Sequence, residues 1–270
     1  MKTLLIHQEG ARLDEEVMSR WLGSFSDVVG RVVLREPRGR KWHRVRREVK
    51  RVGVLRLFDV LAFRAFHRLV LRPRDRDWEN ELASSLAAQF PPLDPALPVL
   101  ETESANNDEV VEFIRALEPD IVVARCRTIL QPKVFSIPKQ GTFVMHPGVA
   151  PEYRNAHGCF WALANRDLDK VGMTLIRIDE GVDTGPVYGY FSYDYDEASE
   201  SHSRIQKRVV FENLGALRRK LLEIERGAAE PIDVSGRTSR AWGQPWLTKY
   251  IRWKRRAMRK RPSAVRERAI

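Results

Sequence analysis

The residues best suited to chemistry in this sequence are a histidine and an aspartate. His146 ends the apolar run Gly141–Met145, and Pro147 follows it directly. Asp183 lies in a glycine-rich, acidic stretch, Ile178–Pro186. An ordinary imidazole exchanges protons near neutral pH, and a carboxylate beside it favours its charged form. Because an imidazolium next to a reacting carbonyl stabilises the oxyanion, the two residues together predict an acid–base site.

The elements that must position this pair follow from the apolar patterns, which predict an α/β fold with a mostly parallel sheet flanked by helices. The expected strands are Thr3–His7, Val28–Leu34, Pro119–Arg125, Thr142–His146, Val171–Ile178 and Val187–Tyr193. The expected helices are Leu13–Phe25, Asp108–Leu117, Leu130–Phe135, Gly158–Asn165 and one long helix, Glu197–Arg226. His146 would then lie at the carboxyl end of a strand, which is where open α/β sheets bind ligands.

Two parts of the chain lie outside this alternation. We expect residues 1–227 to form the principal domain, with residues 35–82 as an irregular, basic, helical insertion. Within the insertion, Leu55–Leu71 has apolar residues at helical intervals and arginines on the other face. This pattern fits a lid packed on the domain, which we favour, and also a helix on an anionic membrane surface. Residues 228–270 form a short, basic and aromatic C-terminal extension.

The extension has an aromatic half and a basic half. Trp246, Tyr250 and Trp253 recur at helical spacing, which predicts a helix docked near the long helix Glu197–Arg226. Aromatic residues among basic ones could also hold single-stranded nucleic acid by stacking. We favour docking, so nucleic acid is not the expected partner. The segment Lys254–Arg268 has few apolar residues, and we expect it to fray.

Composition limits the kinds of partner, metal site and cellular location that the protein can be expected to have. The net charge is +11, but twelve basic residues and one acid lie between Arg237 and Ile270, so the remainder is balanced. This argues against a protein coated by nucleic acid. Cys126 and Cys159 form neither a metal-ligand spacing nor a disulfide framework, so we expect no metal site and a cytoplasmic location. Charged residues interrupt the apolar stretch Val52–Leu71, which excludes a transmembrane segment there. The oligomeric state is left open.

Several runs of the sequence resemble the folate-dependent formyltransferases, a family whose members act on glycinamide ribonucleotide, methionyl-tRNA and amino sugars. The runs are Asp120–Ala124, Ile129–Pro132, Gly141–Asn155, Val171–Thr174 and Asp179–Pro186. The most specific feature is His-Pro with a second proline close behind, followed at a distance by Val-Asp-Thr-Gly. The resemblance implies a Rossmann-like formyltransferase domain, a 10-formyltetrahydrofolate co-substrate and formyl transfer to an amine.

The resemblance also implies roles for individual residues. His146 would stabilise the oxyanion, and Asp183 would orient and charge His146. The segment expected to line the pterin pocket comprises Arg127, Thr128, Ile129 and Leu130. The turn expected to close that pocket comprises Asp179, Glu180 and Gly181, up to Asp183.

One position departs from the family pattern. The family motif is Asn-x-His, and its asparagine holds the formyl oxygen, whereas this sequence has Val144 at that position of the cofactor pocket. Loss of an oxyanion donor costs about 10²–10³ in rate in other enzymes. Three explanations stay open. Asn155 supplies the amide as a catalytic residue, with His157 able to contribute; the site runs a modified reaction, such as 10-formyltetrahydrofolate hydrolysis; or the protein binds folate without turnover.

The acceptor is expected to be a small-molecule amine. Methionyl-tRNA formyltransferases add a sizeable C-terminal domain, and the segment after Gly227 is too short for an independent domain of that kind. An amine on a sugar, an amino acid or a secondary metabolite therefore fits better than tRNA.

Overall fold

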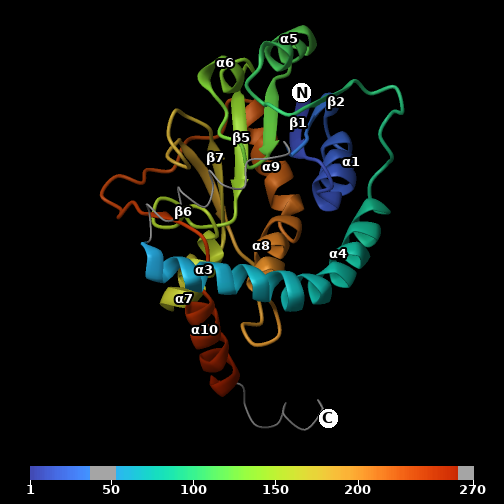
Figure 1. Cartoon of the computed structure of the whole chain (residues 1–270). Coiled ribbons are helices and arrows are strands. Elements are labelled where there is room, and N and C mark those ends of the chain that lie inside the picture. The colour runs from blue at the N-terminus through green and yellow to red at the C-terminus, as the bar shows by residue number, and fades with distance from the viewer. Residues whose placement is uncertain (37–52, 261–270) are drawn as a thin grey trace.

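The fold is built on a seven-stranded sheet in the order β3-β2-β1-β4-β5-β7-β8. A computed structural model describes residues 1–36 and 53–260 of the chain (Figure 1). The basic segment Arg38–Arg51, which belongs to the expected insertion, lies outside the described residues. The strands are β1 (Lys2–Gln8), β2 (Asp27–Leu34), β3 (Val99–Thr102), β4 (Ile121–Arg125), β5 (Gly141–His146), β7 (Met173–Arg177) and β8 (Val187–Phe191).

The sheet is mostly parallel, which confirms the predicted fold class. Strands β1 to β5 pair in parallel, and β7 joins β5 in the antiparallel sense, followed by β8. Because the first five strands share a direction, the carboxyl ends of β4 and β5 lie at the same edge. That edge receives His146.

Successive side chains along the strands point to opposite faces of the sheet, and this divides most of the core into two layers. In β1, Leu5 packs in the cluster on one face, whereas Leu4 and Ile6 pack on the other. In β4, Val123 and Val122 divide in the same way. This is the pattern that a sheet covered on both faces requires, since successive strand side chains point to opposite sides.

The helices cover both faces (Figure 1). One layer contains α5 (Asp108–Leu117) and α6 (Pro132–Phe135). The other contains η1 (Leu13–Met18), α1 (Ser19–Gly23), α7 (Gly158–Asn165), α8 (His202–Phe211) and α9 (Leu214–Glu225). The expected insertion is helical in its described part, where α3 (Val54–Phe66), η2 (His67–Leu71) and α4 (Arg72–Ala87) follow one another directly. None of the helices in the described ranges is long and apolar enough to cross a bilayer.

The prediction of one long helix over Glu197–Arg226 is wrong. Two helices, α8 and α9, occupy this range and are separated at Asn213. The amide nitrogen of Asn213 donates to the carbonyls of Val209 (2.8 Å) and Ser192 (3.0 Å). Asparagine competes for backbone groups in this way, which disfavours a continuous helix. At the start of the range, Ser201 caps α8 by accepting from the Arg204 amide at 3.0 Å.

The extension docks on the body, and its helical part continues further toward the C-terminus than the sequence predicted. Helix α10 spans Leu247–Lys260, so the expectation that the chain frays from Lys254 onward is wrong as far as Lys260. The Trp253 indole is buried and donates to Glu197 Oε2 at 2.8 Å. The ammonium group of Lys254 donates to the carbonyls of Glu197 (2.8 Å) and Ala198 (3.2 Å), and burial lowers the pKa of Lys254 to about 8. Residues 261–270 lie outside the described residues.

Docking of α10 can be tested through Trp253. Replacing it by alanine removes a buried ring and leaves Glu197 without its indole donor, which should reduce the free energy of unfolding by about 3–5 kcal/mol. Ile251→Ala is the control, because this side chain of the same helix is 38% exposed and its loss should cost less than about 0.5 kcal/mol. Urea unfolding followed by circular dichroism measures both. Equal midpoints for the two variants would show that α10 does not depend on this contact.

Candidate active site

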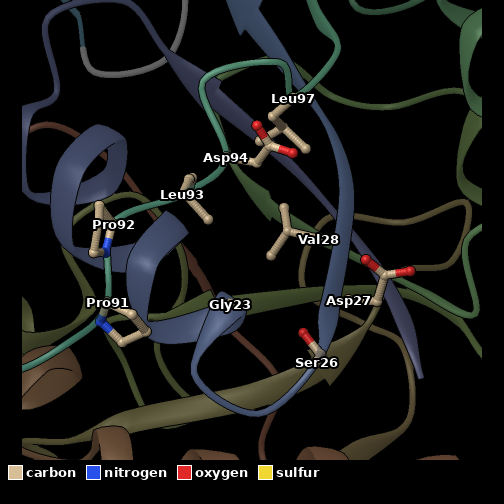
Figure 2. A pocket seen from close by; sticks show the side chains of 9 residues that line it. All are labelled: Gly23, Ser26, Asp27, Val28, Pro91, Pro92, Leu93, Asp94 and Leu97. Carbon is tan, nitrogen blue, oxygen red and sulfur yellow. The ribbon is translucent and has the colours of Figure 1, made fainter.

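A cavity of about 960 Å³ opens at the carboxyl ends of β4 and β5. Its walls come from the segment after β4, the end of β5, the turn after β7, and single residues of α3 and α8. A second cavity of about 200 Å³ lies between the start of β2 and residues 91–97. Figure 2 shows Val28, Leu93 and Leu97 beside it, and the carboxylate of its Asp94 is held in a local turn by the Ala96 amide at 2.8 Å. The residues expected to be catalytic, His146, Asp183 and Asn155, line the larger cavity and not the second one.

His146 and Asp183 meet on the wall of this cavity. The Nδ1 atom of His146 lies 3.4 Å from Asp183 Oδ2, and the two side chains are 6% and 13% exposed. The sequence separates them widely, but β5 carries one and the turn after β7 carries the other. The pairing of these two strands brings both to the same sheet edge.

Both ring nitrogens of His146 face protein acceptors. Nε2 lies 2.8 Å from the Tyr153 carbonyl oxygen, so Nε2 carries a proton and donates there. The ring can donate to the carbonyl and to Asp183 together only as an imidazolium, with a proton on each nitrogen. The Tyr153 carbonyl reaches the ring because Gly148 and Gly158 lack side chains. A Cβ at Gly148 would stand 2.5 Å from that carbonyl oxygen and 2.7 Å from Nε2.

Asn155 lies on the same cavity wall but is engaged elsewhere. Its backbone amide donates to Asp183 Oδ2 at 2.7 Å. Its side-chain nitrogen donates to the carbonyl of Trp242, where β6 (Arg154–Asn155) pairs with β9 (Ala241–Trp242). Asn155 thus links Asp183 to the C-terminal extension in the conformation described.

Val144 occupies the wall next to this pair. It is paired with Ala124 of β4 and Ile176 of β7, and it packs with the cluster that contains Ala150 and Val187. The position that the family resemblance assigns to asparagine therefore presents an apolar side chain to the cavity.

The structure brings most of the expected cofactor residues to the cavity. On its wall are Arg127, Thr128, Ile129, Leu130, Val144, Asp179 and Gly181. Glu180 is exposed and is not among the lining residues. The first segment is clamped by Asn106, whose side chain donates to the Ile129 carbonyl at 2.9 Å and accepts from the Gln131 amide at 2.8 Å. The turn is held by Asp179, which accepts from the amide of Gly181 at 3.0 Å.

Several lining residues were not expected from the sequence. Arg125 donates to Asp14 at 2.8 Å and to the Met145 carbonyl at 3.1 Å, so an ion pair stands behind the end of β5. Asp14 lies in the first turn of η1, the helix after β1, and its place beyond a strand end was a usable signal. Arg64, Gln206 and Gln244 also line the cavity. They come from α3, α8 and the extension, and no local pattern identifies them.

A cluster of histidines lies behind one side of the cavity. His157 lines the wall, with its ring centroid 5.9 Å from that of His202, which is 5.7 Å from that of His67. Burial lowers the pKa of His157 to about 4 and holds the pKa of His202 well below its ordinary value. These rings are therefore neutral at neutral pH. Within the described ranges, no group of three or more His, Cys, Asp or Glu side chains is placed to hold a metal.

The histidine cluster should make the free energy of unfolding depend on pH in the acidic range. Below pH ~6.5 the unfolded chain takes up protons that the folded chain does not, so the free energy of unfolding should fall as pH drops toward 4. Each such histidine contributes up to about 1.4 kcal/mol per pH unit. His202→Phe should make the slope of unfolding free energy against pH shallower. Tyr250→Phe, in the same cluster, is the control, since the pKa of Tyr250 is raised to about 12. An unchanged slope in His202→Phe would contradict the assignment.

Comparison with known proteins places this geometry in a family. A family model described as formyl transferase matches residues 73–221, more than half of the chain. Methionyl-tRNA formyltransferases of Thermotoga neapolitana and Thermotoga maritima are 35% and 32% identical over 115 residues. These matches cover 42% of this chain and 36% of each relative, so the chain matches about a third of the length of these relatives.

Solved structures show the same fold. A sugar N-formyltransferase from a Shewanella species superposes with a TM-score of 0.53 at 14% identity, over 90% of this chain and 76% of that one. A phosphoribosylglycinamide formyltransferase from Anaplasma phagocytophilum gives a TM-score of 0.53 at 10% identity, over 91% and 99%. At these identities the likeness concerns the fold. Together with the family model that matches more than half of its length, it shows that this chain belongs to the formyl transferase family.

Proposed function

We propose that this chain transfers a formyl group from 10-formyltetrahydrofolate to the amine of a small-molecule acceptor. The observation that carries the proposal is the contact between His146 and Asp183, 3.4 Å apart on the wall of the cavity. Membership of the formyl transferase family supports the reaction class. The relatives and structural neighbours are named as formyltransferases of methionyl-tRNA, sugars and phosphoribosylglycinamide.

In the proposed reaction the acceptor nitrogen forms a bond to the formyl carbon, and the carbonyl becomes an oxyanion. Collapse of this intermediate breaks the bond from the formyl carbon to N10 of the folate. The amine loses a proton and N10 gains one, which gives the formamide and tetrahydrofolate. An imidazolium at His146 would stabilise the oxyanion. For Nε2 to reach it, the ring must release the Tyr153 carbonyl, while Asp183 holds the ring through Nδ1.

The lining of the cavity offers separate groups of residues for donor and acceptor. The segment Arg127–Leu130 and residues Asp179 and Gly181 of the turn line the cavity together with the pair, and we propose that they hold the pterin. Arg64, His157 and Gln206 line the cavity from α3, the start of α7 and α8. We assign this wall to the acceptor, because the pterin assignment leaves it free.

The extension favours a small acceptor over nucleic acid. Trp242 stacks on Trp161 with ring centroids 4.8 Å apart, and Trp253 is buried. Tyr250 is buried against Phe63 of α3, 5.6 Å between centroids. Aromatic rings committed to these contacts are not available to stack on bases, which is how such residues hold single strands. The interpretation that the aromatic residues serve docking therefore supports the small-molecule proposal.

The role of His146 can be tested by substitution. Purified protein incubated with 10-formyltetrahydrofolate and a panel of small amines should release tetrahydrofolate only when an acceptor is present. His146→Ala should lower kcat by at least about 100-fold, because the oxyanion loses its cationic donor. His67→Ala, which changes a histidine away from the cavity wall, should keep wild-type kcat. Full activity in His146→Ala would contradict the mechanism, and donor loss without any amine would contradict transfer.

Val144 gives an independent test. Val144→Asn places an amide on the cavity wall beside His146 and should raise kcat by about tenfold or more, since one oxyanion donor is worth about 10²–10³ in rate. Val144→Ala is the matched control, because it shortens the side chain without adding a donor. Single-turnover rates with saturating donor measure the effect. Equal rates for the asparagine and alanine variants would show that the valine does not limit oxyanion stabilisation.

A further inference from the structure

We infer that this protein docks on anionic membrane surfaces through its α3–α10 surface. We define that surface by the exposed apolar side chains Phe58, Leu61, Leu69, Val70, Ile251 and Met258 and by the exposed arginines Arg252, Arg255 and Arg259 of α10. The inference goes beyond the proposed function and does not depend on it. Figure 1 shows α3 crossing the lower part of the molecule, with α10 projecting below it.

The apolar part of this surface is concentrated on neighbouring helices and has no partner within residues 1–36 and 53–260. The structure has ten large hydrophobic side chains that are exposed among the described residues, and six of them lie on α3, η2 and α10. Phe58 is 66% exposed, Leu69 is 73% exposed, and Leu61 lies between them at helical spacing. Large exposed apolar side chains gathered on adjoining helices mark an interaction site.

The two helices are held against each other, so their exposed side chains lie on adjoining elements. The ring of Tyr250 on α10 lies 5.6 Å from that of Phe63 and 5.5 Å from that of Phe66 on α3. The Thr248 amide at the start of α10 donates to Asp59 of α3 at 2.9 Å. The contacts bury one side of each helix and leave the apolar side chains named above outside.

The charge of this surface is predominantly positive. Helix α10 contains seven basic residues and no acid, and the stretch 54–72 has four arginines against a single aspartate, Asp59, which is bonded to Thr248. On α10 itself, Arg252, Arg255 and Arg259 are exposed near Ile251 and Met258. Apolar side chains bordered by arginines match the boundary between acyl chains and anionic headgroups, where each basic residue adds attraction.

Other occupants fit less well. In a two-fold dimer the surface would face itself, and the basic residues of α10 would repel their copies. Nucleic acid would satisfy the charge but would leave Phe58 and Leu69 in water, while Tyr250 and Trp253 are buried and cannot stack on bases. A bilayer surface accounts for both the charge and the apolar side chains. The same helix α3 carries Arg64 on the cavity wall, so docking would hold at the bilayer a helix that also lines the cavity.

The test is sedimentation of the full-length protein with phosphatidylcholine vesicles, made with and without phosphatidylglycerol. We expect binding to the anionic vesicles alone and release at high salt. Phe58→Glu with Leu69→Glu should weaken binding by at least about tenfold, because the apolar face can no longer enter the interface. Val99→Glu with Ile232→Glu is the matched control, since these exposed side chains lie elsewhere and the added charge is the same. Circular dichroism confirms that each variant folds.

The charges are tested separately. Arg255→Gln with Arg259→Gln should weaken binding to anionic vesicles by about thirtyfold, whereas Arg115→Gln with Arg219→Gln, on α5 and α9, should leave it unchanged. The inference is overturned by equal binding of the glutamate variants and wild type, or by absence of vesicle binding. Self-association of the wild-type protein that is lost in Phe58→Glu with Leu69→Glu, without vesicle binding, would assign the surface to a second copy. RNA binding without vesicle binding would assign it to nucleic acid.

Discussion

The geometry of the site depends on one carboxylate oxygen. Asp183 Oδ2 lies 3.4 Å from His146 Nδ1 and accepts the Asn155 amide at 2.7 Å. Asp183 and Asn155 both adopt a positive φ, 52° and 72°, which is uncommon for residues other than glycine. Such backbone conformations persist where surrounding contacts over-determine them. The shared oxygen is one of these contacts, and through Asn155 it extends to β9, so the C-terminal extension helps to fix the ring of His146.

The sequence predicted the elements whose patterns are local and long. Strands β1, β4 and β5 are continuous apolar runs, and helix α5 has both amphipathic spacing and the Asn107 cap, which accepts from the Val110 amide at 3.1 Å. The break between α8 and α9 was missed because apolar residues keep helical spacing across it. The side-chain amide of Asn213 donates both to the Val209 carbonyl of the preceding turn and to the Ser192 carbonyl, and the second of these comes from a distant segment. The end of α10 was missed for a similar reason, since Lys254 is stabilised by carbonyls that the sequence near it does not contain.

In the candidate site, too, the features with local patterns were predictable and those set by packing between distant segments were not. His146, Asp183 and the segment Arg127–Leu130 lie at strand ends or in turns, so strand order alone brings them together. Two further features could not be derived from local patterns. Arg64 reaches the cavity from α3, and the Tyr153 carbonyl occupies His146 Nε2 because of the close approach that Gly148 permits. Both depend on packing between segments that no periodicity connects.

Because Val144 offers no hydrogen-bond donor, stabilisation of the oxyanion in the proposed reaction depends on His146. With an apolar side chain at that position, the side-chain amides on the cavity wall belong to Asn155, Gln206 and Gln244. The amide nitrogen of Asn155 is used by β9, and the glutamines come from α8 and the extension. Helix α3 and the extension both lie outside residues 73–221, the range that the family model matches. Arg64 and Gln244 therefore reach the cavity from outside the matched range, whereas His146, Asp183, Val144 and the Arg127–Leu130 segment lie within it.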